Sequence, residues 1–219
     1  MIFKFVRSQQ EQVREWCRGR NGYARIPLWL FFAYIFIRHV MSIEYQSIIY
    51  PLNLGIHELG HLIFSFAGPF FNTLGGSLVE SLAPIVGMWN FYVQEDYFAL
   101  TMCFGWYSTA LFSVARYVDD ARAMKGPLVS PFGAGEGHDW NYLLGQMGLL
   151  SFDHVIAGII WWAAILSMTV CLVVGGWIIL SMIIQPHREN TGGKYRGTLF
   201  LLTGKYRGTL FLLTQRQQK

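Results

Sequence analysis

Charged side chains are scarce in this chain. Only 14% of its 219 residues are charged, whereas 53% are hydrophobic, and the mean hydropathy is +0.33. Soluble domains carry roughly a quarter charged residues, so this composition excludes an ordinary soluble domain. We predict an integral membrane protein of the all-α class, a polytopic bundle of about five or six transmembrane helices with a possible re-entrant or short interfacial helix.

Cysteine is also scarce. Cys17, Cys103 and Cys171 are odd in number and far apart, which excludes a disulfide framework and a Cys-x-x-Cys zinc site. Any metal must therefore be bound by histidine and carboxylate. The net charge of +4 is small, and the basic residues gather at the ends of the chain, so we expect no nucleic-acid partner. The expected surroundings are a lipid bilayer.

The chain divides into three parts. Residues 1–26 form a basic N-terminal arm, either solvated or a surface helix, which the positive-inside rule places in the cytoplasm. Residues 27–185 hold the transmembrane bundle. Residues 186–219 form a basic tail in which the eleven residues 193–203 recur as 204–214. Two such copies cannot build a solenoid, so we interpret the repeat as a recent duplication or a sequence artefact without a catalytic role.

Apolar segments predict the spans, in chain order, at residues 27–41, 45–67, 78–93, 97–118 and 155–184. Between the second and third, the glycine-rich stretch 68–76 is expected to form a loop or re-entrant turn, or alternatively an edge strand. A short helix ending near Phe152, capped by His138 or Asp139, is too short and polar to cross comfortably.

The charges between the spans predict the sides of the first loops but leave the side of the C-terminal tail open. A cytoplasmic N-terminus would place the acidic residues 94–96 outside and Arg116, Arg122 and Lys125 inside, in agreement with the positive-inside rule. With five spans, however, the basic tail would lie outside, against that rule. Either residues 139–152 cross the membrane as well, or the tail breaks the bias.

The sequence His-Glu-Leu-Gly-His at 57–61 carries the chemistry. On a helix, His57 and His61 lie on one face and can reach a single metal ion, while Glu58 can hold a water on that metal. A pair of buried histidines can also be purely structural. Three ionisable residues inside an apolar span are costly in lipid, however, and this favours a functional site.

A catalytic zinc site needs a third protein ligand and one open position. The candidates along the chain are Glu80, Asp119, Asp120, His138 and Asp139. Asp119 and Asp120 could instead be a solvated juxtamembrane pair, and Asp139 an ordinary helix cap. Asn53, one turn before His57, either hydrogen-bonds in support of the site or simply faces the bundle.

A membrane-embedded H-E-x-x-H followed two spans later by an aspartate at a helix end resembles the site-2 proteases. Their third ligand is the Asp of an N-x-x-P-x-x-x-D-G pattern, and the resemblance assigns that role to Asp120. Here Ser113, Arg116 and Ala121 replace the family's Asn, Pro and Gly. The chain also resembles small bacterial integral-membrane proteins that carry the HELGH and HDWNYLLG stretches and are regarded as metallopeptidases. Asp139 remains the rival ligand; otherwise it and His138 would orient a ligand or stabilise an oxyanion.

The resemblance implies an intramembrane zinc endopeptidase with one Zn²⁺ per chain. Its ligands would be His57, His61 and Asp120, and Glu58 would be the general base. The substrate would be a membrane protein or peptide, and the location the bacterial inner membrane. The alternative is a catalytically silent scaffold or binding protein that retains the fold, although the intact Glu58 argues against it. A diiron oxidase is disfavoured because the six histidines are too few and too scattered.

Overall fold

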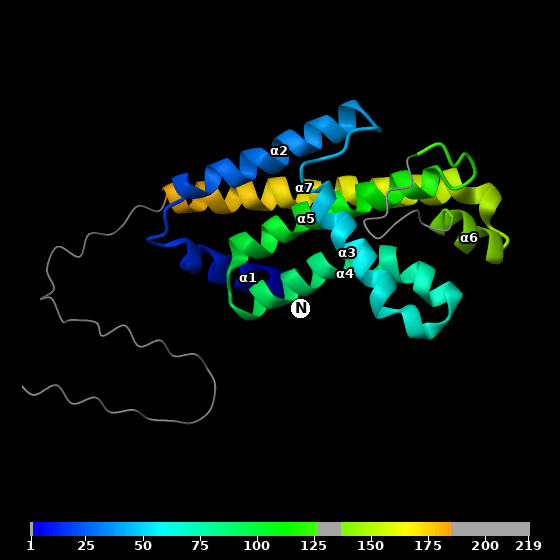
Figure 1. The fold of residues 1–219 in the computed structure, drawn as a ribbon. Helices are drawn as coiled ribbons and strands as arrows, with labels where there is room; N and C mark the ends of the chain where they lie inside the picture. Colours follow the sequence, from blue (N-terminus) through cyan, green and yellow to red (C-terminus); the bar gives the residue numbers. More distant parts are fainter. Residues whose placement is uncertain (1, 127–136, 185–219) are drawn as a thin grey trace, which may run out of the picture. The chain divides into compact units, whose positions relative to one another are not determined.

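The computed structural model describes residues 2–126 and 137–184, all within one compact unit, Met1–His187. These residues form helices and connecting turns and contain no strand (Figure 1). The helices are α1 Ile2–Cys17, α2 Ile26–Met41, α3 Tyr50–Ile63, α4 Pro69–Val93, α5 Tyr97–Asp119, α6 Asp139–Gln146 and α7 Asp153–Ile184. The prediction of an all-α fold is confirmed. The repeat in the tail lies outside the described residues.

Local sequence signals explain where the helices begin. α2, α3 and α4 each have a proline in the first turn, where the missing N–H costs no hydrogen bond. Pro51 thus marks the start of α3. Asp96 caps α5, because its side chain accepts a hydrogen bond of 3.0 Å from the Ala99 N–H. His138 caps α6 in the same way, through its Nδ1 and the Asn141 N–H.

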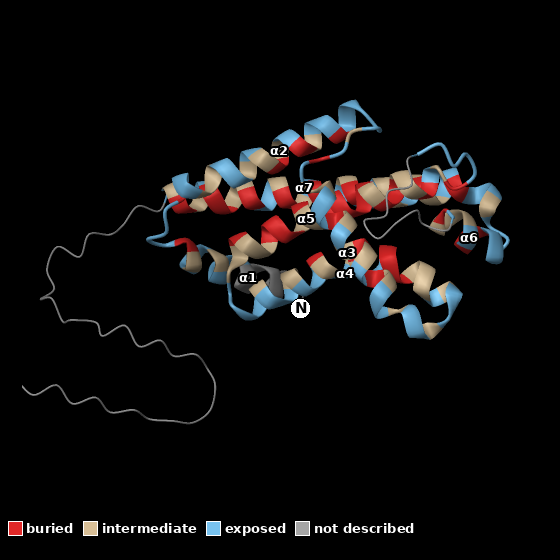
Figure 2. Ribbon diagram, viewed as in Figure 1, coloured by how far each residue is buried: buried red, intermediate tan, exposed pale blue. Residues whose placement is uncertain are grey.

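α5 is the central helix and packs along α7, while α2 lies against α7 and α4 against α5 (Figure 1). The buried positions of α5 and α7 face each other, whereas the outer sides of α2 and α7 are exposed (Figure 2). Exposed apolar residues of α7 recur at helical spacing: Val155, Ile159, Trp162, Leu166 and Val173. The exposed Thr169 among them donates its hydroxyl hydrogen to the Ile165 carbonyl oxygen. Such an outward apolar stripe is what lipid contact requires.

In the described part of the chain, three segments are long and apolar enough to cross a membrane: Tyr23–Met41, Tyr97–Asp119 and Leu150–Ile184. They correspond to α2, α5 and α7. Helices of this length and apolar composition are those of an integral membrane protein. α3 has only 14 residues and α6 only eight. A helix needs about 20 residues to span the hydrocarbon core, so neither crosses by itself.

The stretch 68–76 differs from its prediction. Only Gly68 breaks the helix, with φ of +88°, a backbone conformation that disfavours any side chain. α4 begins at the next residue, Pro69, and runs through Gly75 and Gly76 without a loop, re-entrant turn or edge strand. The two glycines do not end the helix. Their lack of side chains instead allows α3 to approach α4 closely.

The start of α5 lies at a different end of the bundle from the one that the sequence-based topology predicted. The Trp16 and Tyr97 rings lie 5.6 Å apart, and Arg25 lies 5.4 Å from the Phe98 ring. The start of α5, just after the acidic turn 94–96, therefore shares one end of the bundle with the N-terminal residues rather than lying opposite to them. The reason is that α3 is too short to be a separate crossing.

The N-terminal arm forms a helix whose end packs against the bundle. α1 ends at Cys17, which is fully buried against α7, with its Sγ 3.8 Å from the Ile178 carbonyl oxygen. All three cysteines are buried and free, in agreement with the predicted lack of disulfides.

Candidate metal centre

α3 and α4 approach each other closely through glycine. A side chain on Gly60 would collide with the Gly75 backbone, and one on Gly75 would lie 2.7 Å from the Gly60 carbonyl oxygen. The next residue, Gly76, faces the two histidines of α3. A Cβ there would lie 2.5 Å from His57 Nε2 and 2.6 Å from His61 Nε2. Glycine at 76 therefore keeps open the space beside both nitrogens.

Each histidine is oriented through its Nδ1 by an acceptor on α4. His57 Nδ1 lies 3.1 Å from Glu80 Oε2, and His61 Nδ1 lies 2.8 Å from the Asn72 carbonyl oxygen. A carbonyl or an ionised carboxylate can only accept, so each partner favours the tautomer with hydrogen on Nδ1. The Asn72 amide in turn donates to the His61 carbonyl oxygen at 2.9 Å. Both Nε2 lone pairs are thus left for a metal ion.

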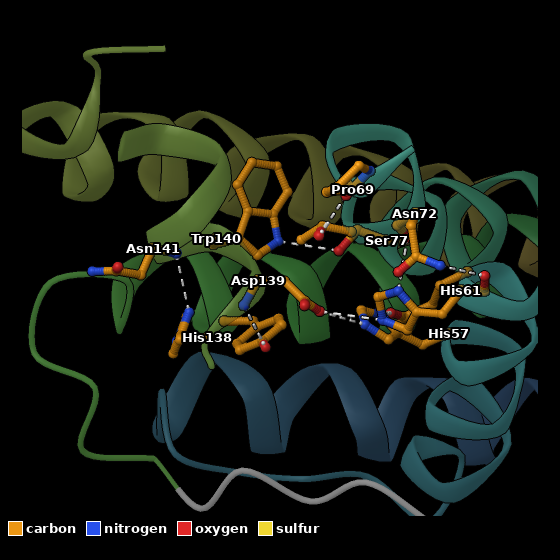
Figure 3. A network of polar contacts seen from close by, with 12 residues as sticks. His57, His61, Pro69, Asn72, Ser77, His138, Asp139, Trp140 and Asn141 are labelled. Atoms are coloured by element: carbon orange, nitrogen blue, oxygen red, sulfur yellow. Dashed lines mark hydrogen bonds and ion pairs between the residues drawn. The ribbon is translucent and has the colours of Figure 1, made fainter. Parts of the chain in front are cut away.

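The third group is Asp139, on the first residue of α6. Its backbone N–H donates to the Tyr117 hydroxyl at 3.1 Å. The next two residues tie α6 to α4 and to the end of α5: Trp140 Nε1 donates to Ser77 Oγ at 3.1 Å, and Asn141 Nδ2 donates to the Ala121 carbonyl oxygen at 2.8 Å. These bonds hold the Asp139 carboxylate pointed at the two imidazoles (Figure 3).

The three groups have spacings that suit a tetrahedral ion. Asp139 Oδ2 lies 3.2 Å from His57 Nε2 and 3.3 Å from His61 Nε2, and one ligand atom from each residue falls within 4.8 Å of the others. Zinc bonds of about 2.0–2.1 Å place two tetrahedral ligands roughly 3.3–3.4 Å apart. The donor set and its spacing therefore fit a zinc site with His57, His61 and Asp139 as ligands.

Asp139 is suited to bind a cation. Burial alone would raise the pKa of its carboxyl group, but when His57 and His61 are protonated, their hydrogen bonds and charges outweigh burial and lower that pKa to about 2. The group is therefore an ionised carboxylate at neutral pH.

Glu58 follows the first histidine and is half-buried. Within residues 2–126 and 137–184 its carboxylate has no hydrogen-bond or ion-pair partner. It lies close enough to Tyr117 to act on that hydroxyl electrostatically, and the Tyr117 ring in turn lies 6.0 Å from the His57 ring. An unpaired carboxylate beside the ligand group is available to exchange a proton with a bound water.

The remaining candidate ligands lie elsewhere. Asp120, which the resemblance favoured, accepts hydrogen bonds from the backbone N–H groups of Lys125 and Gly126, at 2.9 and 2.8 Å, and so closes the turn after α5. Its Oδ2 lies 3.6 Å from His138 Nε2, a nitrogen without a hydrogen-bond partner in the described part of the chain. Asp119 pairs with His154 at 2.6 Å. The structure thus brings Asp139, and not Asp120, together with His57 and His61.

Asn53 makes no hydrogen bond to either histidine among the described residues. Its Oδ1 accepts a hydrogen bond of 3.0 Å from Trp106 Nε1, and its Nδ2 donates to Thr109 Oγ1 at 3.3 Å. Asn53 therefore joins α3 to α5 inside the bundle, which was the alternative interpretation of this residue.

Sequence reasoning missed several supporting residues. Glu80 was considered only as a ligand, whereas the structure places it behind His57. The contributions of Asn72 and Tyr117 had no signal in the sequence, because each depends on how separate helices pack. Gly75-Gly76 did carry a signal: paired glycines inside an apolar helix can mark a close backbone approach as well as a break.

Comparison with protein-family models, with curated proteins and with solved structures finds no match for this chain. The functional argument therefore rests on the residues and geometry of the site itself.

Proposed function

We propose that this chain is an intramembrane zinc-dependent endopeptidase of the site-2-protease type. The observation that supports this most is the convergence of His57, His61 and Asp139 beside the unpaired carboxylate of Glu58. Catalytic zinc sites combine three protein ligands with one open position, and this group matches that pattern with one Zn²⁺ per chain.

The chain's own residues would divide the work of peptide hydrolysis. Zinc, when bound, supplies the Lewis acidity that acidifies water and polarises a peptide carbonyl. Glu58 accepts the proton of the attacking water and returns it to the leaving amine. Glu80 and the Asn72 carbonyl oxygen hold the imidazoles of His57 and His61 in the ligating orientation. A helical substrate must unwind before its carbonyls are accessible.

The same proposal covers the arrangement in the membrane. We expect α4, with 25 residues, to cross beside α2, α5 and α7, and we expect α3 to enter without crossing. This gives four crossings in place of five or six. The expected location is the bacterial inner membrane, and the expected substrates are membrane proteins.

A catalytically silent scaffold is the second candidate. It is favoured by the direct contacts of Asp139 with both Nε2 atoms, at 3.2 and 3.3 Å, because a shared proton could also stabilise that arrangement without a metal ion. Such a protein would have the same helices but no turnover.

The test compares wild type with Glu58→Gln, which removes the general base and leaves the three ligands in place. Both proteins are expressed in a strain without the native copy. Zinc per chain is measured on the purified proteins, and new N-termini in membrane proteins are mapped by mass spectrometry. Glu44→Gln, the same chemical change at an exposed carboxylate outside the ligand group, serves as the matched control.

The proposal expects zinc in both wild type and Glu58→Gln, with cleavage products that appear for wild type and are lost in the variant. Zinc without any difference in N-termini between the two would favour the scaffold. Wild type without zinc would reject the metallopeptidase.

A further inference from the structure

The bundle has two chemically different ends. At the first, α1, the start of α5 and the last turns of α7 meet: Trp16 lies against Tyr97, and Cys17 against Ile178. A side chain on Gly22 would also collide with Ile179 and Ile183, so the start of α2 belongs to this group. We call this the basic end.

The candidate metal centre lies at the other end. Tyr117, whose hydroxyl holds the Asp139 N–H, is twenty residues after Tyr97 on the same helix. At 1.5 Å per residue, that separation is about 30 Å, the thickness of the hydrocarbon core. The bond of 2.7 Å between Arg122 and Asp153 joins the end of α5 to the start of α7 at this same level. We call this the site end.

Exposed arginines gather at the basic end: Arg14, Arg18 and Arg20, with the half-buried Arg25 beside them. Among the described residues none of these four has a carboxylate partner. Arg20 lies over the Trp16 ring at 4.2 Å, and Tyr23 is 67% exposed nearby. Unpaired arginines with tryptophan and tyrosine are typical of a membrane surface rich in anionic headgroups.

The sequence that follows α7 carries further positive charge. Arg188, Lys194 and Arg196 come within twelve residues of Ile184, with Glu189 as the single acid. The basic end also holds acids: Glu11 and Glu15 among the six basic residues of 1–26, and Glu95 and Asp96 before α5, so its basic residues remain in excess. The site end has no such excess. Its basic residues, Arg38, Arg116, Arg122 and Lys125, are accompanied by acids: Glu44, Asp119, Asp120, Asp139 and Asp153.

We propose that the basic end lies in the cytoplasm and that the metal centre opens at the extracytoplasmic surface of the membrane. The excess of lysine and arginine next to the spans sets this orientation. It also removes the conflict in the sequence-based topology, because α7 returns the chain to the side of its N-terminus. Resting on the proposed peptidase function, the inference narrows the substrate class to peptide bonds at the extracytoplasmic ends of membrane-protein helices.

Cysteine labelling tests the orientation on the full-length chain. The three native cysteines are buried, so their background reaction is low. Tyr23→Cys reports the basic end and Met124→Cys the site end, since these residues are 67% and 55% exposed. Ile48→Cys, at a residue 78% exposed in the connection before α3, is a second reporter of the site end. Right-side-out vesicles are treated with a membrane-impermeant maleimide before and after detergent.

The proposal expects Met124→Cys and Ile48→Cys to react in sealed vesicles and Tyr23→Cys to react only after detergent. The reverse pattern, or reaction of all three in sealed vesicles, would overturn it, as would detergent-only reaction at both site-end positions. The labelling involves neither metal nor cleavage. A protein without zinc could still show the expected orientation, and a zinc protein could show the reverse, so the two proposals fail separately.

Discussion

Gly76→Ala is the sharpest perturbation of the metal centre that leaves every ligand in place. The added methyl carbon would lie 2.5 Å from His57 Nε2 and 2.6 Å from His61 Nε2, whereas ordinary contact begins at 3.4 Å. Both rings would have to retreat by about 0.8–0.9 Å, several times the roughly 0.2 Å tolerance of a metal–ligand distance. Changes to residues that only orient ligands weaken metal binding 10- to 100-fold, so we expect at least about 100-fold here, or about 2.7 kcal/mol.

The assay is zinc affinity by competition with a chromogenic chelator, on protein purified in detergent. Gly55→Ala is the control, because it makes the same chemical change on α3 at a position where a Cβ meets nothing within 4 Å. Helix content by circular dichroism shows whether each variant is folded. If folded Gly76→Ala bound zinc as tightly as Gly55→Ala, the two histidines could not be ligands in this geometry.

Three further changes separate metal binding from stability. Glu80→Ala should weaken zinc affinity about 10- to 100-fold because His57 loses the acceptor at its Nδ1. Glu80→Gln still offers an oxygen and should weaken the affinity less. Equal affinities in wild type and both variants would argue against a role of Glu80 in orienting His57. Asn53→Ala should lower the free energy of unfolding by about 1–3 kcal/mol, since the half-buried Trp106 indole N–H loses its acceptor, without changing zinc content. Arg122→Gln should lower the melting temperature, because the buried Asp153 carboxylate loses its charged partner, and unchanged melting would contradict that pairing.

The sequence predicted much of the helical framework. The limits of α2, α5 and α7 lie within a few residues of the predicted spans, because long apolar runs with charged or proline boundaries leave few alternatives. The segment 45–76 was harder. The glycines of 68–76 were interpreted as a break, yet Gly75 and Gly76 lie inside α4 and face α3. Local sequence carries little information about which helix a glycine faces.

The site was predicted in part. His57 and His61 follow from helical spacing, which is a local property. The choice between Asp120 and Asp139 is not local, because it depends on how α6 docks against α4 and α5. Trp140 is the informative residue here: its indole reaches Ser77 on α4 and fixes the preceding aspartate beside the histidines. The resemblance to the site-2-protease pattern favoured Asp120, which directly follows the last residue of α5.

The measurement that tests the central claim most directly is metal content by elemental analysis of purified wild type, His57→Ala, Asp139→Ala and Asp120→Ala. We predict about one zinc per chain in wild type and in Asp120→Ala, and loss of the metal in His57→Ala and Asp139→Ala. Full zinc in Asp139→Ala, or its loss in Asp120→Ala alone, would contradict the ligand set. Absence of metal from the wild type would contradict the metal centre itself.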